Sequence, residues 1–587
     1  MQSSPNPMKK QTATVSRTPL NAPISPRTVF SPVPWTVWFR KKFQTKIQNV
    51  HFNHFLAGLF LGPVLLLQTA SQSQAQLALD RYQLGRRLER FERTWEQATE
   101  PKRTSSTPAM ERAVTSFFSL QLAQAGQSLD QAWMDSLGIP PNEQTKWMHS
   151  TRWLLDWERP WIAPTADSNN PTSNRLRGQL REFYAAPTAN NSEQTDALSN
   201  QKWLLKIYHW KQNSTEVAQI SAYQTTLSSP VSTGDPKSSE ASVEIPLQDL
   251  APGDYRVSIS IEGQKDQPEI LCEAFSVIDR IDSRMQSVEK WLESNGKIST
   301  SKKSTDRQSI NQLSTATEIS TARFLAKELL KGRKGTPTEI DFPWHQLLSD
   351  FEQITAPKKQ DSPRGLQEWA MNPGTKWVQL SREKDSQVAR IEVPECDAIS
   401  NPTANKRIPV LIALHGAGGS ENMFFETYGA GRLVSLAKTR GWLVVSPRQT
   451  MSGLGMDMPT MIDALAELWP IDRDQILLCG HSMGAAQALV QVSRSPKTFR
   501  AVAALGGGGS VRSSDAIKDV PFFVAAGERD FGKPRAKTLV SQLRGLNCNV
   551  EYREYPNVEH MVIVQAALND IFVFFDKFAG STASDSH

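Results

Sequence analysis

The sequence predicts a multidomain protein whose last third is an α/β domain built on a mostly parallel, eight-stranded sheet. Eight short runs of residues between 376 and 555, several of them continuously apolar, are strand candidates. One of these runs ends in a glycine-rich turn and continues directly into small residues typical of a helix. The chain also has 587 residues, which is too many for one domain of the usual size of about 150 residues.

The first two runs should pair as an antiparallel hairpin at the sheet edge. The other six should be parallel, with helices on both faces. The strands are expected at Lys376–Leu380, Gln387–Val393, Ile408–Leu414, Trp442–Ser446, Gln475–Cys479, Ala501–Leu505, Pro521–Ala526 and Val550–Tyr555.

The turn after the fifth run carries the strongest chemical signal in the chain. It reads Gly480-His481-Ser482-Met483-Gly484. A serine with glycines two residues away on each side, between a strand and a helix, indicates a nucleophile elbow. So tight a turn strains the serine backbone and leaves room only for tiny neighbours. A Gly-Ser turn in some other kind of α/β unit is the alternative interpretation.

A serine nucleophile needs an acid and a histidine, which follow it in that order in such a domain. Only His560 and His587 follow Ser482, and His587 ends a polar tail, so His560 is the expected base. Asp530 lies three residues past the glycine that ends the strand at 521–526 and is the expected acid, with Glu528 in reserve. A helix-capping or turn role is the alternative for Asp530.

Two backbone N–H groups are needed to stabilise an oxyanion. Met483 supplies the first, and the loop from His415 to Ser420 should supply the second. Ala417 is the expected donor, Gly416 is the alternative, and His415 should brace the loop rather than act as a base. A phosphate-binding loop is disfavoured because the sequence has no G-x-x-x-x-G-K-[ST] motif.

These segments resemble the α/β-hydrolase superfamily. The residues that carry the resemblance are Leu414–Ser420, Ile471–Gln475, Gly480–Gly484, Gly527-x-x-Asp530 and His560. They are most similar to its lidless branch, which holds polyhydroxyalkanoate depolymerases, feruloyl and acetylxylan esterases, and dienelactone-hydrolase-like and prolyl-oligopeptidase-like proteins. The resemblance covers residues 375–580 and departs at Gln475, where the branch often carries arginine.

The resemblance implies Ser482 as nucleophile, His560 as general base, Asp530 as its orienting acid, and Met483 and Ala417 as oxyanion donors. It implies no metal and no organic cofactor. Only 15 residues, Gly506–Val520, lie where many hydrolases insert a lid, so the domain itself should present an open cleft. Any cover must come from short loops such as Met423–Tyr428 or from the N-terminal region.

The expected reaction is hydrolysis of a carboxylic ester through an acyl-enzyme, on a small-molecule or polymeric substrate. A serine peptidase of prolyl-oligopeptidase-like type and a non-catalytic binding or scaffold protein are the alternatives. The peptidase is disfavoured because those relatives usually carry a propeller of repeated blades, and the sequence shows no repeats. The oligomeric state is left open.

Residues 1–75 are expected to form a basic leader with a signal peptide. They hold eight Lys or Arg and no acidic residue, with an apolar core at 55–67 and small residues at a cleavage site, Ser73-Gln74-Ala75. The protein should therefore be exported to the periplasm, cell surface or medium, and an uncleaved leader would tether it to a membrane. The remaining chain is nearly neutral, so no nucleic-acid partner is expected.

Between leader and hydrolase the sequence predicts a helical segment at 76–165, an immunoglobulin-like β-sandwich at 179–280 and a helical linker region at 281–370. Helices are expected at 76–98, 110–137, 281–296 and 310–332. The tryptophans at 147, 153, 157 and 161 favour core packing over sugar stacking. Cys479 should be a packed thiol, and a Cys396–Cys548 disulfide is left open.

Overall fold

The computed structural model describes residues 63–164, 175–185, 202–210, 219–226, 241–246, 250–261, 270–295, 310–335, 341–356, 365–401, 406–450 and 453–579. Contacts group residues 67–587 into one compact unit, to which the following description is confined. The predicted leader lies mostly outside the described residues. The predicted cleavage site at 73–75 lies within the continuous helix α2, Pro63–Gln97.

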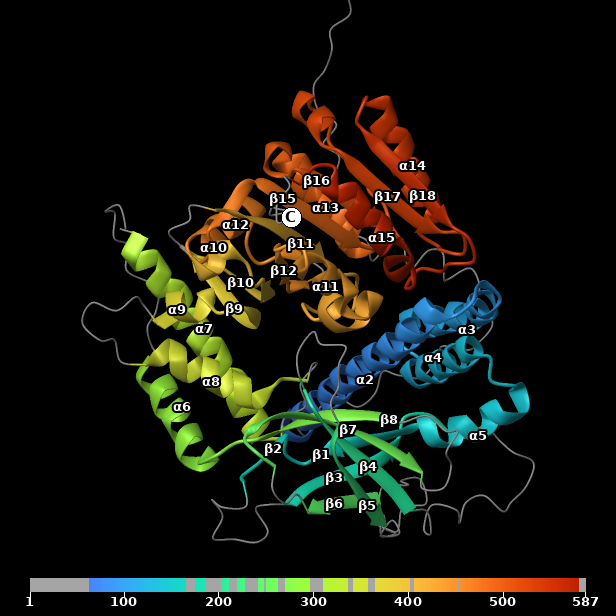
Figure 1. The fold of residues 1–587 in the computed structure, drawn as a ribbon, viewed down its shortest axis with the longest axis vertical. Coiled ribbons are helices and arrows are strands. Elements are labelled where there is room, and N and C mark those ends of the chain that lie inside the picture. Colours follow the sequence, from blue (N-terminus) through green and yellow to red (C-terminus); the bar gives the residue numbers. More distant parts are fainter. Residues whose placement is uncertain are drawn as a thin grey trace, which may run out of the picture. The chain divides into compact units, whose positions relative to one another are not determined.

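An eight-stranded sheet carries the C-terminal domain, as the sequence predicted (Figure 1). Its order is β18-β17-β16-β15-β11-β12-β10-β9. The edge strand β9 pairs antiparallel with β10, β10 pairs antiparallel with β12, and all other neighbours are parallel. The strands are β9 (Gly374–Arg382), β10 (Asp385–Val393), β11 (Ile408–Leu414), β12 (Leu443–Pro447), β15 (Ile471–His481), β16 (Ala501–Leu505), β17 (Phe522–Gly527) and β18 (Val550–Tyr555).

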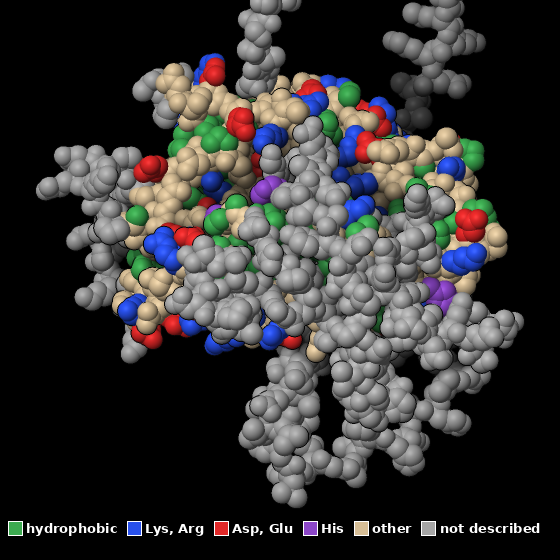
Figure 2. Space-filling view, turned by 60° about the horizontal axis from the view of Figure 1, so that its bottom comes forward, with side chains coloured by type: hydrophobic (Ala, Val, Ile, Leu, Met, Phe, Trp, Pro, Cys, Tyr) green, Lys and Arg blue, Asp and Glu red, His purple; other side chains and the backbone are tan. Residues whose placement is uncertain are grey.

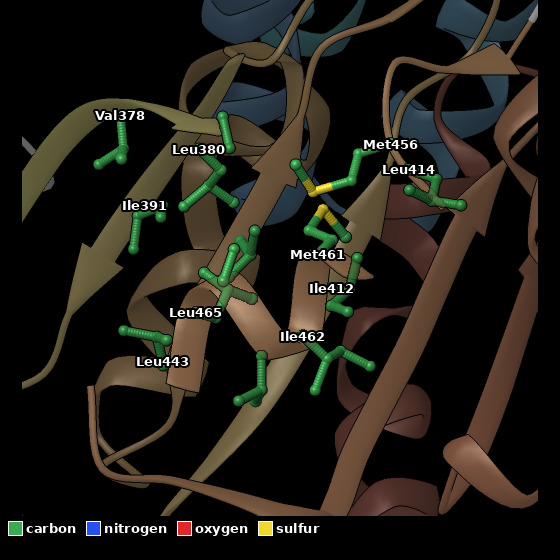
Figure 3. Close-up of a cluster of buried hydrophobic side chains, with 14 of the residues drawn as sticks. Val378, Leu380, Ile391, Ile412, Leu414, Leu443, Met456, Met461, Ile462 and Leu465 are labelled. Atoms are coloured by element: carbon green, nitrogen blue, oxygen red, sulfur yellow. The ribbon is translucent and has the colours of Figure 1, made fainter. Parts of the chain in front are cut away.

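Alternate residues of the central strands face the two sides of this sheet, because side chains of a strand alternate between its faces. Val410, Ile412 and Leu414 of β11 belong to one buried cluster, and Leu411 and Ala413 belong to another. Figure 3 shows part of the first cluster, where side chains of β9 to β12 converge with those of α12. Both faces are therefore apolar, which explains why these strands read as unbroken apolar runs.

Helices cover each face. The first face packs against α12 (Met458–Ala466), α13 (Met483–Arg494) and α14 (Lys533–Gly545). It also packs against helices from the predicted linker region, so that region shares the core of the sheet. These helices are α6 (Ile281–Asn295), α7 (Ile310–Arg333), α8 (Trp344–Thr355) and α9 (Gly365–Met371). The short α10 (Asp397–Ser400) follows β10.

The second face packs against α11 (Arg432–Lys438), α15 (Ile563–Asp576) and the N-terminal helices. Those helices are α2, α3 (Glu100–Phe118), α4 (Leu122–Leu137) and α5 (Pro141–Thr151). The single helix expected at 110–137 was wrong, because the chain breaks between α3 and α4. Leu120 adopts a positive φ of 60° there, which an α-helix cannot accommodate.

Two smaller sheets occupy the region predicted as a sandwich. One has the order β1-β3-β6 and the other β2-β8-β7-β4-β5. Side chains from β1, β3, β4, β7 and β8 share one buried cluster, but an immunoglobulin-like topology stays a prediction. The strands are β1 (Trp153–Trp157), β2 (Trp161–Ile162), β3 (Arg175–Glu182), β4 (Lys202–His209), β5 (Gln219–Thr226), β6 (Ala241–Pro246), β7 (Gly253–Ile261) and β8 (Ile270–Val277).

Several smaller expectations can be compared with the structure. Trp153 and Trp161 are buried, as core packing requires. Cys396, Cys479 and Cys548 are free thiols, so the Cys396–Cys548 disulfide is not formed. Of the helices described, none combines the length and apolarity that crossing a bilayer would require. Acidic and basic side chains are both spread over the described part of the face in Figure 2.

Candidate active site

Ser482 sits in the predicted sharp turn between β15 and α13. Its φ of 56° and ψ of −114° lie outside the regions that non-glycine residues normally occupy. A Cβ on Gly480 would lie 2.3 Å from the carbonyl oxygen of Gly484, and a Cβ on Gly484 would lie 1.9 Å from that of Leu414. Both positions therefore require glycine, Gly480 because of contacts within the turn and Gly484 because of the adjacent strand β11.

The structure brings the three predicted side chains together. His560 Nε2 is 2.9 Å from Ser482 Oγ, and His560 Nδ1 is 2.8 Å from Asp530 Oδ1. The three residues come from turns at the carboxyl ends of β15, β17 and β18, which meet at one edge of a parallel sheet. An ionised Asp530 accepts only, so it fixes the proton on Nδ1 and leaves Nε2 free to accept from the serine hydroxyl.

Asp530 is held in its ionised form. Burial acts to raise its pKa, but the charge of His560 and hydrogen bonds from His560 and the Gly532 N–H outweigh burial. The pKa of Asp530 therefore lies below its usual value. The Gly532 N–H donates to Asp530 Oδ1 at 2.6 Å. Glu528, the reserve candidate, is exposed and instead accepts from the Asn557 N–H at 3.0 Å.

The predicted glycine loop lies beside the serine. A Cβ on Gly416 would be 3.3 Å from Ser482 Cβ, and Ala417 lines the same cavity as Ser482 and His560. The Gly416 backbone hydrogen-bonds the Tyr428 hydroxyl, which favours Ala417 over Gly416 as the free donor. Met483 begins α13, so its N–H is one of those at a helix N-terminus that have no carbonyl partner within the helix.

His415 braces this loop, as expected. Its Nδ1–H donates to the Gly416 carbonyl at 2.8 Å, and its Nε2 accepts from the Gln449 N–H at 3.1 Å. Burial lowers the pKa of His415, which favours the neutral ring that this pattern requires.

His481, a histidine that the sequence did not single out, supports the expected base His560. His481 Nε2–H donates to the carbonyl oxygen of His560 at 2.8 Å. Burial, followed by the charge of His560, lowers the pKa of His481 to about 3, so the ring stays neutral. The position of His481 directly before Ser482 was the signal that the sequence offered. Only the fold brings the backbone of His560 next to it.

Glu559 is the other neighbour that sequence reasoning missed. Its carboxylate is buried and accepts from the Met561 N–H at 2.8 Å and the Val562 N–H at 2.9 Å. Burial raises its pKa to about 7, although these hydrogen bonds and the charge of His560 act in the opposite direction. The hydrogen bonds to Glu559 therefore hold the backbone turn from which His560 projects.

Two charged residues on the segments that follow β11 and β12 have ion-pair partners. Arg448 pairs with the buried Glu421, and Glu426 pairs with the buried Arg390 at 2.8 Å.

The cleft is partly covered by other parts of the chain. A cavity of about 70 Å³ lies over Ser482 and His560, and its walls include residues of α2, α3 and α4. The cover therefore comes from the N-terminal helices together with Met423 and Tyr428 of the short loop, the two sources that the sequence left open.

The sheet order and the elbow are those of the α/β-hydrolase fold that the sequence resembles. No protein-family model matches the sequence, and no curated protein does. Among solved structures, similarity is found to a ferulic acid esterase. The match has 18% sequence identity, covers 36% of this chain and 100% of that chain, and has a TM-score of 0.30. An S-formylglutathione hydrolase from Staphylococcus aureus matches with 16% identity, 34% of this chain, 99% of that chain and a TM-score of 0.29. A thermostable esterase matches with 13% identity, 73% of this chain, 100% of that chain and a TM-score of 0.31.

Proposed function

We propose that this protein is an exported serine hydrolase that cleaves a carboxylic ester through an acyl-enzyme. The observation that carries the proposal is the buried His560 ring, which bridges Ser482 Oγ and Asp530 Oδ1 at 2.9 and 2.8 Å. A strained serine backbone at the same point supports it, because strain of this kind clusters at active sites.

The reaction follows from the roles these groups can take. His560 Nε2 accepts the proton of Ser482 as its oxygen attacks the acyl carbon. Asp530 stabilises the imidazolium that forms, and the N–H groups of Met483 and Ala417 receive the negative oxygen. Each such donor typically contributes about 3 kcal/mol to lowering the barrier. The imidazolium then gives its proton to the leaving alcohol, and water resolves the acyl-enzyme by the same steps in reverse.

An ester suits this site better than the alternatives. A scaffold protein would have no need to keep a strained serine, an oriented base and an ionised acid together. The propeller of prolyl-oligopeptidase-like proteins has no counterpart in the described residues before the hydrolase domain, where the structure has helices and two small sheets. The basic leader with its apolar core supports export.

Ser482→Ala tests the proposal. The variant should keep its fold and lose hydrolysis of p-nitrophenyl acetate and labelling by a fluorophosphonate. Ser541→Ala is the matched control, because Ser541 lies on the exposed side of α14. Undiminished hydrolysis by Ser482→Ala would refute the assignment. N-terminal sequencing of the protein recovered outside the cytoplasm tests export.

A further inference from the structure

The walls of the cavity over Ser482 are mostly apolar and come from two regions far apart in the sequence. On the N-terminal side, Leu84 and Leu88 of α2 and Met110, Val114 and Phe117 of α3 line it. These positions recur every three or four residues, so each helix presents one apolar stripe to the cavity. On the hydrolase side lie the glycine loop, Ser482 and His560.

This wall is attached to the hydrolase domain by specific contacts. Glu92 of α2 accepts from the Ala430 N–H at 3.2 Å, and Glu96 pairs with Arg432 at 2.7 Å. Thr107 Oγ1 of α3 donates to the Asn557 carbonyl at 2.7 Å, three residues before His560. The apolar stripes are therefore held in place over the reacting groups.

Of the described residues that line the cavity, Arg81 is the single Lys, Arg, Asp or Glu. Its Nε is buried and has no hydrogen-bond partner within the described part of the chain. The other arginines of α2 have acidic partners: Arg86 and Arg93 pair with Glu89, and Arg87 and Arg90 pair with Asp130. Arg81 as a whole is half-buried, and no described acidic side chain pairs with it, so a bound anion would supply a partner for its buried Nε.

We propose that the cavity binds the non-reacting part of the ester, which is apolar along its length and carries a carboxylate that pairs with Arg81. The inference rests on the proposed function of Ser482 and specifies its substrate class. The apolar stripes of α2 and α3 would hold the chain, and the planar guanidinium would bind the carboxylate through two parallel hydrogen bonds. The carboxylate could belong to the acyl or to the alcohol side of the ester.

Matched pairs of esters test the proposal on the full chain. On the acyl side, mono-p-nitrophenyl adipate and suberate are compared with p-nitrophenyl hexanoate and octanoate. On the alcohol side, 6-acetoxyhexanoate is compared with hexyl acetate. We expect a higher kcat/KM for the carboxylate member of at least one pair. Arg81→Gln should lower that preference at least about tenfold, or about 1.4 kcal/mol, and Arg81→Lys should retain part of it.

Arg93→Gln is the matched control, because it removes a half-exposed guanidinium from the same helix and should leave the preference unchanged. Ala113→Leu, which adds volume at the α3 wall, should shorten the longest acyl chain that is hydrolysed efficiently. Thermal unfolding and fluorophosphonate labelling of each variant confirm that it is folded.

A direct binding measurement separates this inference from the proposed function. Ser482→Ala is titrated calorimetrically with monomethyl suberate and with methyl octanoate. If monomethyl suberate binds more strongly than methyl octanoate, and the Ser482→Ala, Arg81→Gln double variant loses this difference, the inference is supported. This result does not depend on whether the wild type hydrolyses either ester. Equal binding of both esters, or no effect of Arg81→Gln, would overturn the inference. If Ser482 is still labelled by the fluorophosphonate and p-nitrophenyl acetate is still hydrolysed, the hydrolase assignment stands in that case.

Discussion

Replacing Glu559 by glutamine should change the way in which stability depends on pH. The carboxyl is buried beside His560 and accepts two backbone N–H groups just before α15. Burial raises its pKa from 4.5 to about 7, with Asp530 acting in the same direction and His560 against it. The nearby Glu92, whose pKa is also raised by burial, is a further acidic neighbour.

The sign and size follow from proton linkage. Between pH 4.5 and 7 the folded state keeps this proton while the unfolded state loses it, so stability falls as pH rises through that window. The pKa difference of about 2.5, at about 1.36 kcal/mol per pH unit, amounts to about 3.4 kcal/mol of lost stability above pH 7. Glutamine cannot ionise, so this loss disappears in the variant.

Urea unfolding of both proteins at pH 5.0 and 7.5 measures the effect. Glutamine loses one of the two N–H contacts, which lowers stability by a similar amount at both pH values. Relative to wild type, the free energy of unfolding of Glu559→Gln should therefore rise by about 2 kcal/mol from pH 5.0 to pH 7.5. Glu528→Gln is the control, because that exposed carboxylate also accepts a backbone N–H. An equal offset between Glu559→Gln and wild type at the two pH values would refute the reasoning.

Two further substitutions test the site itself. Asp530→Asn should lower kcat by about 10³- to 10⁴-fold with little change in KM, since the amide no longer fixes the proton on Nδ1; near-normal kcat would contradict the role of Asp530. Gly484→Ala would place a Cβ 1.9 Å from the Leu414 carbonyl and should abolish fluorophosphonate labelling and lower the urea midpoint. Gly545→Ala, whose Cβ would meet nothing within 4 Å, is its control, and equal behaviour of the two would contradict the packing argument.

The resemblance and the local patterns predicted the catalytic domain well. The central strands are continuous apolar runs and the outer ones alternate apolar with polar residues, so all eight could be located from the sequence. The spacing of Gly480 and Gly484 around Ser482 could be recognised in the sequence, although Gly484 is required by the adjacent β11 rather than by the turn itself. His560 and Asp530 followed from their order after Ser482 and from the strands that precede them.

The sequence by itself thus determined the sheet, the nucleophile turn and the three side chains around it, because each depends on local geometry or chain order. Only the tertiary structure decided that α2 and α3 cover Ser482, that His481 supports the His560 backbone and that Arg81 faces the cavity. These contacts join segments tens to hundreds of residues apart. An amphipathic stripe shows that a helix buries one face, but it carries no information about which surface that face will meet.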